Sequence, residues 1–355
     1  MLNADQAGVV SWEVHIVAES NAPAMPRAQP DREMLRSALA SAVRAPSVHN
    51  TQPWLWRIGD STVHLYADES RWLPHTDPEG RDLLLSCGAA LHHLRVAALG
   101  LGWETVIHRL PDPTEPRHLA VVEFRAAATT PEAFRMAGAI YRRHTDRRRY
   151  ASRAVPVAYV EAVAAGAGNG VHARCINAGP ARTQLLRAFE QAAWEHTRDF
   201  SYGLELAQWS GRHSAPERHA VLLAGDPAVR PFSNPGLPQT VIGGVDAADR
   251  LILLSTPGDD RLSRLRAGEA ASAVLLTATT LGLATCPLTE PLELTGTRNR
   301  IRTNVLGESG YPHIVVRIGW AEESAGPVPA TPRRPLDEVL HPLDAAVSDA
   351  GARKR

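Results

Sequence analysis

Ten residues, Ala45-Pro46-Ser47-Val48-His49-Asn50-Thr51-Gln52-Pro53-Trp54, carry the clearest indication of this chain's architecture. They follow a predicted helix, which begins after Asp31 and whose apolar residues recur at helical spacing until Pro46 ends it. Ser, Asn and Pro are common in turns, so a plain turn is one interpretation. The carboxamides of Asn50 and Gln52 also suit the mixed donor and acceptor edge of a heteroaromatic ring, so a ring-binding loop is the other.

Strands and helices follow this loop in a regular order. Alternating apolar residues in Trp54–Ile58 and Val63–Tyr66 predict a two-stranded hairpin. The other predicted elements are helices at about 82–99, 132–140, 181–197 and 263–281, and strands at 119–124, 251–255 and 313–319. The segment at about 198–250 loses its periodicity in its later part, and a segment this irregular is usually a functional lid or disordered.

Two of the predicted helices can be superimposed without a gap. Gly88, Ala90, Ala98, Leu101 and Gly102 of the first coincide with Gly268, Ala270, Ala278, Leu281 and Gly282 of the second. Small residues at helical spacing allow another backbone to approach closely. Alanine-rich helices can resemble each other by chance, but a strand follows both of these, so an internal repeat is the interpretation favoured here.

The most concentrated positive charge lies in Tyr141–Tyr150, which reads Tyr-Arg-Arg-His-Thr-Asp-Arg-Arg-Arg-Tyr. Such a run is either a solvated turn or a phosphate cradle. Arginine presents a planar fork that matches phosphate oxygens, and the Thr145 hydroxyl adds a neutral donor, so the cradle is favoured. A second basic pair, Arg333-Arg334, follows Pro332 and could approach the same phosphate from another segment.

Composition limits the function classes. At 355 residues the chain is long enough for about two domains. Its 38 basic and 38 acidic residues create no overall field for nucleic acid or an anionic membrane. The three cysteines form no CxxC pair, and the adjacent His92 and His93 point about 100° apart on a helix, so no metal site is predicted. We expect a cytoplasmic protein, because neither a leader nor a membrane-spanning run is evident.

Several motifs together resemble the nitroreductases. The stretch Ala45–Trp54 resembles their APSxxNxQPW motif, and Arg143–Arg147 is similar to the R-x-S/T-x-R/K motif that holds the FMN phosphate. The segment Leu281–Thr289 resembles the family's GLGTCWIG-type turn, whose backbone amides meet the flavin edge. Gly319-Trp320 with Pro332–Leu336 is similar to its closing strand and C-terminal phosphate-contacting arginine. The segments Asp77–Asp82 and Ser86–His93 resemble the actinobacterial Acg-like subfamily of large nitroreductase-fold proteins.

The resemblance implies an α+β nitroreductase fold with an internal duplication that gives a fused pseudo-dimer. Ordinary nitroreductases are homodimers with two flavins bound between subunits. Here the phosphate motif occurs only in the second half and the APSxxNxQPW motif only in the first, so one FMN between the halves is expected. The residues implied to bind it are Arg143, Thr145, Arg147 and Arg333 at the phosphate and Ser47, Asn50, Gln52, Pro287, Leu288 and Thr289 at the ring.

The expected organisation is an arm at 1–30, a first half at 31–130, a second half at 139–340 with a lid-like insertion at about 198–245, and a tail at 341–355. The implied function is hydride transfer from NAD(P)H to a nitro compound or quinone, with no catalytic side chain required. The alternative is a redox-inactive protein that stores FMN beneath the lid. A hydrolase is disfavoured because no G-x-S-x-G elbow is present. The pseudo-dimer is expected to be a monomer or to dimerise further.

Overall fold

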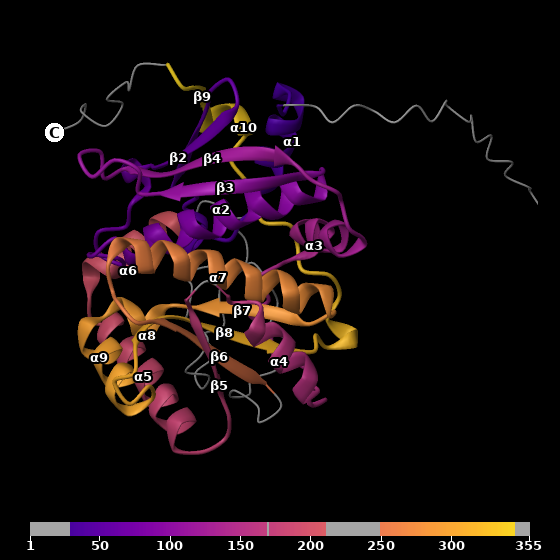
Figure 1. Ribbon diagram of the computed structural model, residues 1–355. Helices are drawn as coiled ribbons and strands as arrows, with labels where there is room; N and C mark the ends of the chain where they lie inside the picture. Colours follow the sequence, from indigo (N-terminus) through magenta and orange to yellow (C-terminus); the bar gives the residue numbers. More distant parts are fainter. Residues whose placement is uncertain (1–28, 169, 211–248, 345–355) are drawn as a thin grey trace, which may run out of the picture.

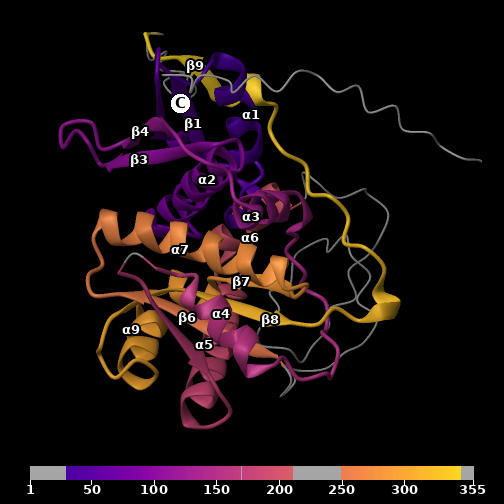
Figure 2. The ribbon, with the colours of Figure 1, turned by 45° about the vertical axis from the view of Figure 1, so that its right-hand side comes forward.

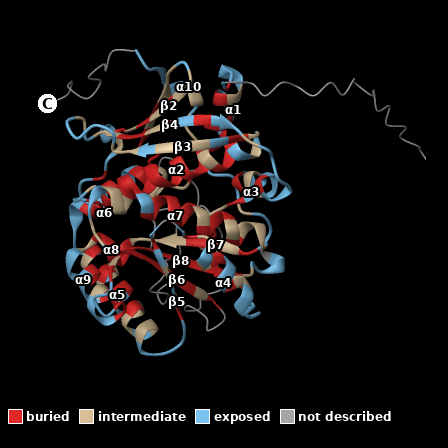
Figure 3. Cartoon of the chain, viewed as in Figure 1, coloured by how far each residue is buried: buried red, intermediate tan, exposed pale blue. Residues whose placement is uncertain are grey.

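The computed structural model describes residues 29–168, 170–210 and 249–344. Most of the predicted arm, lid and tail therefore lies outside the described residues. Two β-sheets enclose a central pair of long helices, α2 (Arg81–Gly100) and α7 (Arg261–Thr280), and further helices cover the far side of the second sheet (Figure 1). Buried residues are concentrated along these two helices (Figure 3).

The elements of the first half confirm most of the predicted ones. Its helices are α1 (Arg32–Ala42), α2 and α3 (Pro131–Arg142), and its strands are β1 (Trp54–Ile58), β2 (Thr62–Ala67), β3 (Trp103–Arg109) and β4 (His118–Ala126). The Asp31 side chain caps α1 by accepting a hydrogen bond from the Met34 amide at 2.8 Å. Short 3-10 turns, η1 (Val48–Asn50) and η2 (Glu69–Arg71), flank the hairpin.

The second half adds elements that the sequence pattern did not reveal. Its strands are β5 (His172–Ile176), β6 (Arg250–Thr256), β7 (Ala284–Leu288) and β8 (Tyr311–Gly319), and its helices are α4 (Val157–Ala165), α5 (Pro180–His196), α6 (Phe200–Ser210), α7, α8 (Glu290–Glu293) and α9 (Thr295–Asn304). Strand β7 lies within the segment predicted as a turn, and α6 occupies the start of the predicted lid. Strand β7 has too little alternation of polar and apolar residues for periodicity to identify it.

Both sheets have the same strand order. The first reads β3-β4-β2-β1-β9 and the second β7-β8-β6-β5, and the neighbours among β1 to β8 are antiparallel. A helix also precedes the first strand of each sheet, and a long helix follows the second. The two halves thus repeat one topology, as the predicted internal duplication requires.

The sheets differ in how they are covered. In β2 buried residues alternate with partly exposed ones, so one face of the first sheet is packed. In β6 all residues after Arg250 are buried, because α7 packs on one face of the second sheet and α5 and α9 on the other. The apolar run Leu251–Leu254 reflects this two-sided burial.

Helices α2 and α7 cross where each has a glycine. A methyl group added at Gly88 would lie 2.1 Å from the carbonyl oxygen of Leu265, and one added at Gly268 would lie 2.1 Å from that of Leu85. Gly88 thus lies against Leu265, three residues before Gly268, and Gly268 lies against Leu85, three residues before Gly88. This reciprocity is the contact pattern of a two-fold interface, here formed within one chain.

Helix α2 also has the length and hydropathy of a membrane-spanning helix, contrary to the expectation that no stretch approaches this composition. However, 83% of its most apolar window is buried inside the protein. Its composition therefore reflects its place between the sheets, in contact with α1, α3 and α7.

Ion pairs join the halves at the motif Asp77–Asp82. Glu79 accepts hydrogen bonds from Arg298 and Arg264 of the second half, and Arg81 pairs with Asp259 at 2.5 Å. Outside this motif, Arg109 at the end of β3 donates two hydrogen bonds to Glu269 of α7, at 2.6 and 2.7 Å. The Acg-like motif thus helps to hold the two halves together.

The C-terminal segment does not stay with the second half, which was expected to extend to residue 340. From β8 it runs along the side of the molecule to the first sheet (Figure 2). There α10 (Leu336–Val339) buries Val339 in the first core, and β9 (Leu340–Pro342) pairs with β1 in parallel. With only three residues, β9 has no detectable period, and its partner β1 is far away in the chain. The local sequence therefore does not predict this strand.

Candidate functional site

The loop after α1 is held in an uncommon backbone conformation. His49, Asn50 and Gln52 have positive φ angles of 44°, 57° and 52°. The Ser47 hydroxyl accepts a hydrogen bond from the Gln52 amide at 2.9 Å, and the Ser86 hydroxyl accepts one from the Val48 amide at 3.1 Å. Non-glycine residues adopt this region rarely, and such strain is found preferentially at functional sites. The structure therefore makes this segment more than an ordinary turn.

The loop contacts the C-terminal segment through its two carboxamides. The Asn50 side chain donates to the Pro332 carbonyl at 3.0 Å and accepts from Arg333 at 3.2 Å. The buried Gln52 side chain accepts from the Arg334 amide at 2.8 Å. These bonds fix the position of the second basic pair relative to the loop.

The basic run after α3 lies against the start of β7. Thr145 forms a parallel bridge with Thr285, and the Asp146 amide donates to the Thr285 carbonyl at 2.8 Å. The Thr285 hydroxyl donates in turn to the His144 carbonyl at 3.3 Å. Pro287, Leu288 and Thr289 follow on the same strand and just past it, and all three are half-buried. The structure thus brings the predicted phosphate motif and the predicted flavin-edge segment onto neighbouring stretches of chain.

Three arginines from separate segments form a positively charged cluster: Arg44, which follows α1, Arg143, which follows α3, and Arg333. Burial, followed by the charges of Arg333 and Arg44, lowers the pKa of Arg143 to about 9. Burial and then Arg44 lower the pKa of Arg333 to about 10. Arg333 also donates to the Arg44 carbonyl at 3.2 Å, and Arg143 to the Thr145 hydroxyl at 3.5 Å.

No carboxylate balances this arginine cluster within the described residues. Salt bridges are found there for Arg148 with Asp146 and for Arg334 with Asp68, but none for the three cluster members. The buried Nε atoms of Arg44, Arg143 and Arg333 also lack a hydrogen-bond partner in the described part of the chain. Arg143 is buried and the other two are half-buried. Cations removed from water are ordinarily paired, so this arrangement has the chemistry of an anion site.

The cluster differs from the predicted phosphate set in one member. Arg44 precedes the loop motif and was not predicted, although its place at the end of α1 and next to that motif was a usable signal. Arg147 was predicted, but it is half-buried and is not among the charges that chiefly lower the pKa of Arg143. Arg147 as a ligand stays a prediction.

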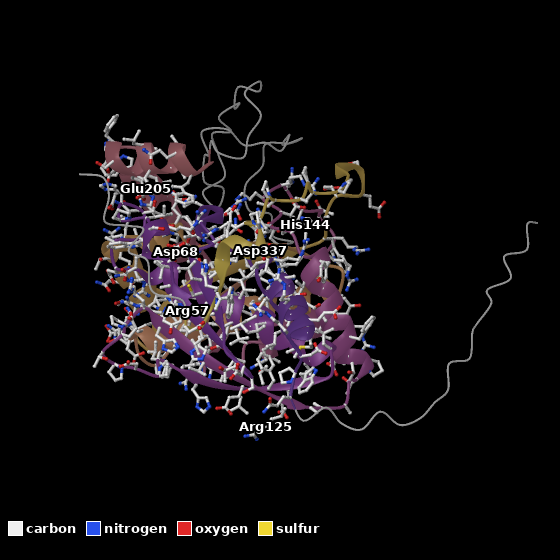
Figure 4. All side chains as sticks on the ribbon, turned by 90° about the horizontal axis from the view of Figure 1, so that it is seen from above. Arg57, Asp68, Arg125, His144, Glu205 and Asp337 are labelled. Atoms are coloured by element: carbon white, nitrogen blue, oxygen red, sulfur yellow. The ribbon has the colours of Figure 1, made fainter. Side chains whose placement is uncertain are left out.

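Helix α6 lies between the loop and the far end of β7. Its Glu205 accepts hydrogen bonds from the amides of Thr76 and His75 in the first half, at 2.7 and 3.3 Å. Its Tyr202 stacks on His196, which contacts Glu290 at 3.3 Å, next to Thr289. In Figure 4, His144 lies on one side of Asp337, and Asp68 and Glu205 lie on the other. The described part of the predicted lid is therefore anchored to both halves.

Comparison with known proteins identifies relatives over nearly the full length. No family model matches the chain. It is 44% identical over 322 residues to the Mycobacterium tuberculosis protein named "Putative NAD(P)H nitroreductase Rv3131". The aligned residues cover 88% of this chain and 92% of the relative. It is 37% identical over 331 residues to "Putative NAD(P)H nitroreductase acg" of the same organism, with 89% and 98% covered. The chain belongs to the Acg-like nitroreductase family.

Solved structures with a similar fold include two smaller nitroreductases. The FMN-dependent nitroreductase NfnB of Mycobacterium smegmatis, in complex with NADPH, is 20% identical with a TM-score of 0.39, and covers 57% of this chain and 97% of its own. A nitroreductase with bound FMN from Bacteroides fragilis is 14% identical with a TM-score of 0.36, covering 56% and 94%. The predicted α+β nitroreductase fold agrees with the names of the relatives that are 44% and 37% identical to this Acg-like protein.

Proposed function

We propose that this Acg-like nitroreductase binds one FMN between its halves, with the phosphate at the arginine cluster. The observation that supports this most is the convergence of the buried Arg143 with the half-buried Arg44 and Arg333, without a carboxylate partner in the described residues. A phosphate would supply acceptors to their free N–H groups and offset their mutual repulsion. The residues present therefore fit the phosphate end of this cofactor.

The remaining residues have distinct roles in this proposal. Asn50 positions Arg333, because its side-chain oxygen accepts from that guanidinium. The loop Ser47–Gln52 and the segment Pro287–Thr289 approach the ring from opposite halves and offer it backbone donors, because the carboxamides of Asn50 and Gln52 are bonded to the C-terminal segment. The Thr289 hydroxyl is bonded to Glu293 at 2.9 Å, so the proposal relies on the Thr289 backbone.

When bound, FMN would supply hydride transfer between a nicotinamide and an acceptor. We propose NAD(P)H as the donor and a nitro compound or quinone as the acceptor, on the strength of the relatives' names. The chain's own part is to bind, orient and shield the cofactor, so no catalytic side chain is assigned. A cytoplasmic location, and a monomer or a dimer of pseudo-dimers, complete the proposal.

Storage of FMN is the second candidate function. It is favoured by α6, the described part of the predicted lid, which is bonded to the first half through Glu205 and packs against η1. If this helix covers the ring, donors and acceptors cannot reach it. The two functions share one binding site and differ only in access.

The absorption spectrum of the purified protein separates these possibilities. We expect a yellow protein that loses its colour under anaerobic NADH or NADPH and regains it on addition of a nitro compound or quinone. A yellow protein that does not respond to either nicotinamide would support storage. A folded, colourless protein with no affinity for added FMN would contradict both.

A further inference from the structure

Two histidines meet on the outer face of the first sheet. In β2, Val63 and Leu65 are buried in the first core, so His64 between them lies on the opposite, half-buried face. Its Nδ1 atom lies 3.1 Å from the Nε2 atom of His118, at the start of β4. The two residues are 54 positions apart in the chain, so the sequence alone does not predict that they form a pair.

An irregularity in the pairing of β2 with β4 places His118 on this face. Leu65 pairs with Ala120. Tyr66, the next residue of β2, pairs with His118 and not with Leu119, which is therefore an extra residue in β4. A β-bulge of this kind redirects side chains relative to a regular ladder. Without it, His118 would fall on the buried face of the sheet.

Each ring is also held by a second neighbour. The Nε2 atom of His64 lies 3.1 Å from the Thr62 hydroxyl. The ring of His118 stacks on Tyr66, with the ring centroids 4.4 Å apart and the planes 10° from parallel. A hydroxyl both donates and accepts, so Thr62 suits either tautomer of His64. When it accepts from Nε2–H, the Nδ1 atom of His64 presents a lone pair on the side of His118.

We propose that His64 and His118 together bind a divalent transition-metal ion, with Cu²⁺ preferred over Ni²⁺ and Zn²⁺. Imidazole nitrogen is a suitable ligand for these ions, and the order follows their general affinities. Two nitrogens about 2.0–2.1 Å from one ion are about 2.8 to 3.4 Å apart at angles of roughly 90° to 110°. The observed 3.1 Å lies in this range.

The proposed ligand set is small. Among the residues that the structure describes, no group of three or more His, Cys, Asp or Glu side chains is placed to hold a metal, so water would complete the coordination. The 3.1 Å separation also suits a hydrogen bond between the two rings. Binding would therefore exchange this hydrogen bond for two coordination bonds, with the ring protons on His64 Nε2 and His118 Nδ1.

The surroundings keep both rings neutral near neutral pH, which is the form that binds metal. Burial, followed by the charges of His118 and Arg57, lowers the pKa of His64. Burial also lowers the pKa of His118, against the opposing effects of a backbone hydrogen bond to Ala120 and the charge of Glu115. Protons thus compete little with a metal here. The charge of Arg57 would oppose a metal ion, and that of Glu115 would favour it.

Binding of Cu²⁺ to the chelator-treated full-length protein tests this proposal. Titration calorimetry with glycine as a weak competitor counts the tightly bound equivalents, and electron paramagnetic resonance detects nitrogen ligands of Cu²⁺. We expect one such equivalent per chain. His64→Gln and His118→Gln should each weaken its binding roughly tenfold or more. His108→Gln removes an exposed histidine of the same sheet, which contacts Glu123, and as the control should leave the affinity unchanged.

The double variant His64→Gln/His118→Gln decides the location of the site. Unchanged Cu²⁺ affinity in this variant would overturn the proposal, because the ion would then be held elsewhere among the 15 histidines of the chain. Absence of any equivalent that withstands glycine in the unaltered protein would overturn it as well. Circular dichroism checks each fold. If the histidine variants do not fold, Thr62→Val replaces them, with a severalfold loss of affinity expected and an unchanged affinity contradicting the proposal.

This site shares no residue with the proposed FMN site. The metal proposal therefore does not depend on flavin binding, and failure of either proposal leaves the other in place.

Discussion

The two halves of the molecule share a strand order but differ in the segments that flank their first helices. After α1 comes the strained loop Ser47–Gln52, whereas after α4 a short turn leads into β5. Before α4 comes the basic run that includes Arg143. The core of the molecule is therefore nearly symmetric and its candidate site is not. Because the two halves lie in one chain and need not be identical, each can carry a different part of that site.

The seam between α2 and α7 shows the same contrast on a smaller scale. Gly88 and Gly268 make equivalent contacts. One turn further along, His92 occupies the position that corresponds to Ser272, and the two side chains contact each other. The contact between the two helices is symmetric at the glycines, where the backbones touch, and asymmetric one turn further along, where a histidine meets a serine.

The largest expected effect is on stability, from substitutions at the two glycines where α2 and α7 cross. Gly88→Ala and Gly268→Ala should each lower the free energy of unfolding by about 3 kcal/mol, because the new methyl group would overlap a backbone carbonyl. Thermal and urea denaturation measure the effect. Gly138→Ala on α3, which would meet nothing within 4 Å, is the control. A large loss at one glycine alone would show that the halves are not equivalent here.

The asymmetry of the site is tested by removing its charges. Arg143→Ala and Arg333→Ala should each weaken FMN binding roughly tenfold to a hundredfold through the loss of a charge-assisted hydrogen bond. Calorimetry or quenching of flavin fluorescence measures the affinity. Arg142→Ala, which removes an exposed neighbour, should have little effect. Retention of full FMN affinity in both cluster variants would mean that the phosphate lies elsewhere.

The arginine cluster should also lower the free energy of unfolding of the flavin-free protein. The pKa of Arg143 in the folded protein is about 9, below that of the unfolded chain, so the buried cation carries a cost at neutral pH. Arg143→Gln should therefore raise the melting temperature of flavin-free protein by a few degrees. The advantage should shrink as pH rises through about 9, because the unaltered folded protein then loses this proton.

Scanning calorimetry of both proteins from pH 7 to 10 tests this prediction. Saturating FMN should reverse the order of the two melting temperatures, because only the unaltered protein keeps the full set of cations for the ligand. A lower melting temperature for flavin-free Arg143→Gln would indicate that the guanidinium has a partner that stabilises the fold.

The smallest expected effects separate the two carboxamides of the loop. Asn50→Ala should alter the flavin absorption spectrum and leave the melting temperature within about 1 °C, since Asn50 is half-buried and holds Arg333. Gln52→Ala should cost about 1 kcal/mol of stability, because the buried side chain bonds the Arg334 amide. A spectrum that is unchanged in both variants would assign the loop a purely structural role.

Much of the fold could be predicted from local sequence. The cap at Asp31, the hairpin of β1 and β2 and both central helices follow from periodicity and turn residues. The strands β3, β5 and β7 could not be predicted in this way, because their burial is set by neighbours from other segments. For β7 the pattern even indicated a turn, and only pairing with β8 makes it a strand.

The candidate site was predictable to a similar extent. Sequence motifs named Arg143, Thr145, Arg333 and Asn50, which the structure brings to one region. They did not name Arg44, and they named Arg333 without showing that its neighbour Arg334 is paired with Asp68.

The sequence by itself determined which residues form helices, where the chain turns, and that a repeat and two polar motifs are present, because these depend on side chains close together in the chain. Tertiary structure decided which arginines lack a carboxylate partner in the described residues and which sheet receives the C-terminal segment. Coulombic interactions and desolvation depend on distance and burial between segments far apart in sequence. Those quantities exist only once the two halves have packed against each other.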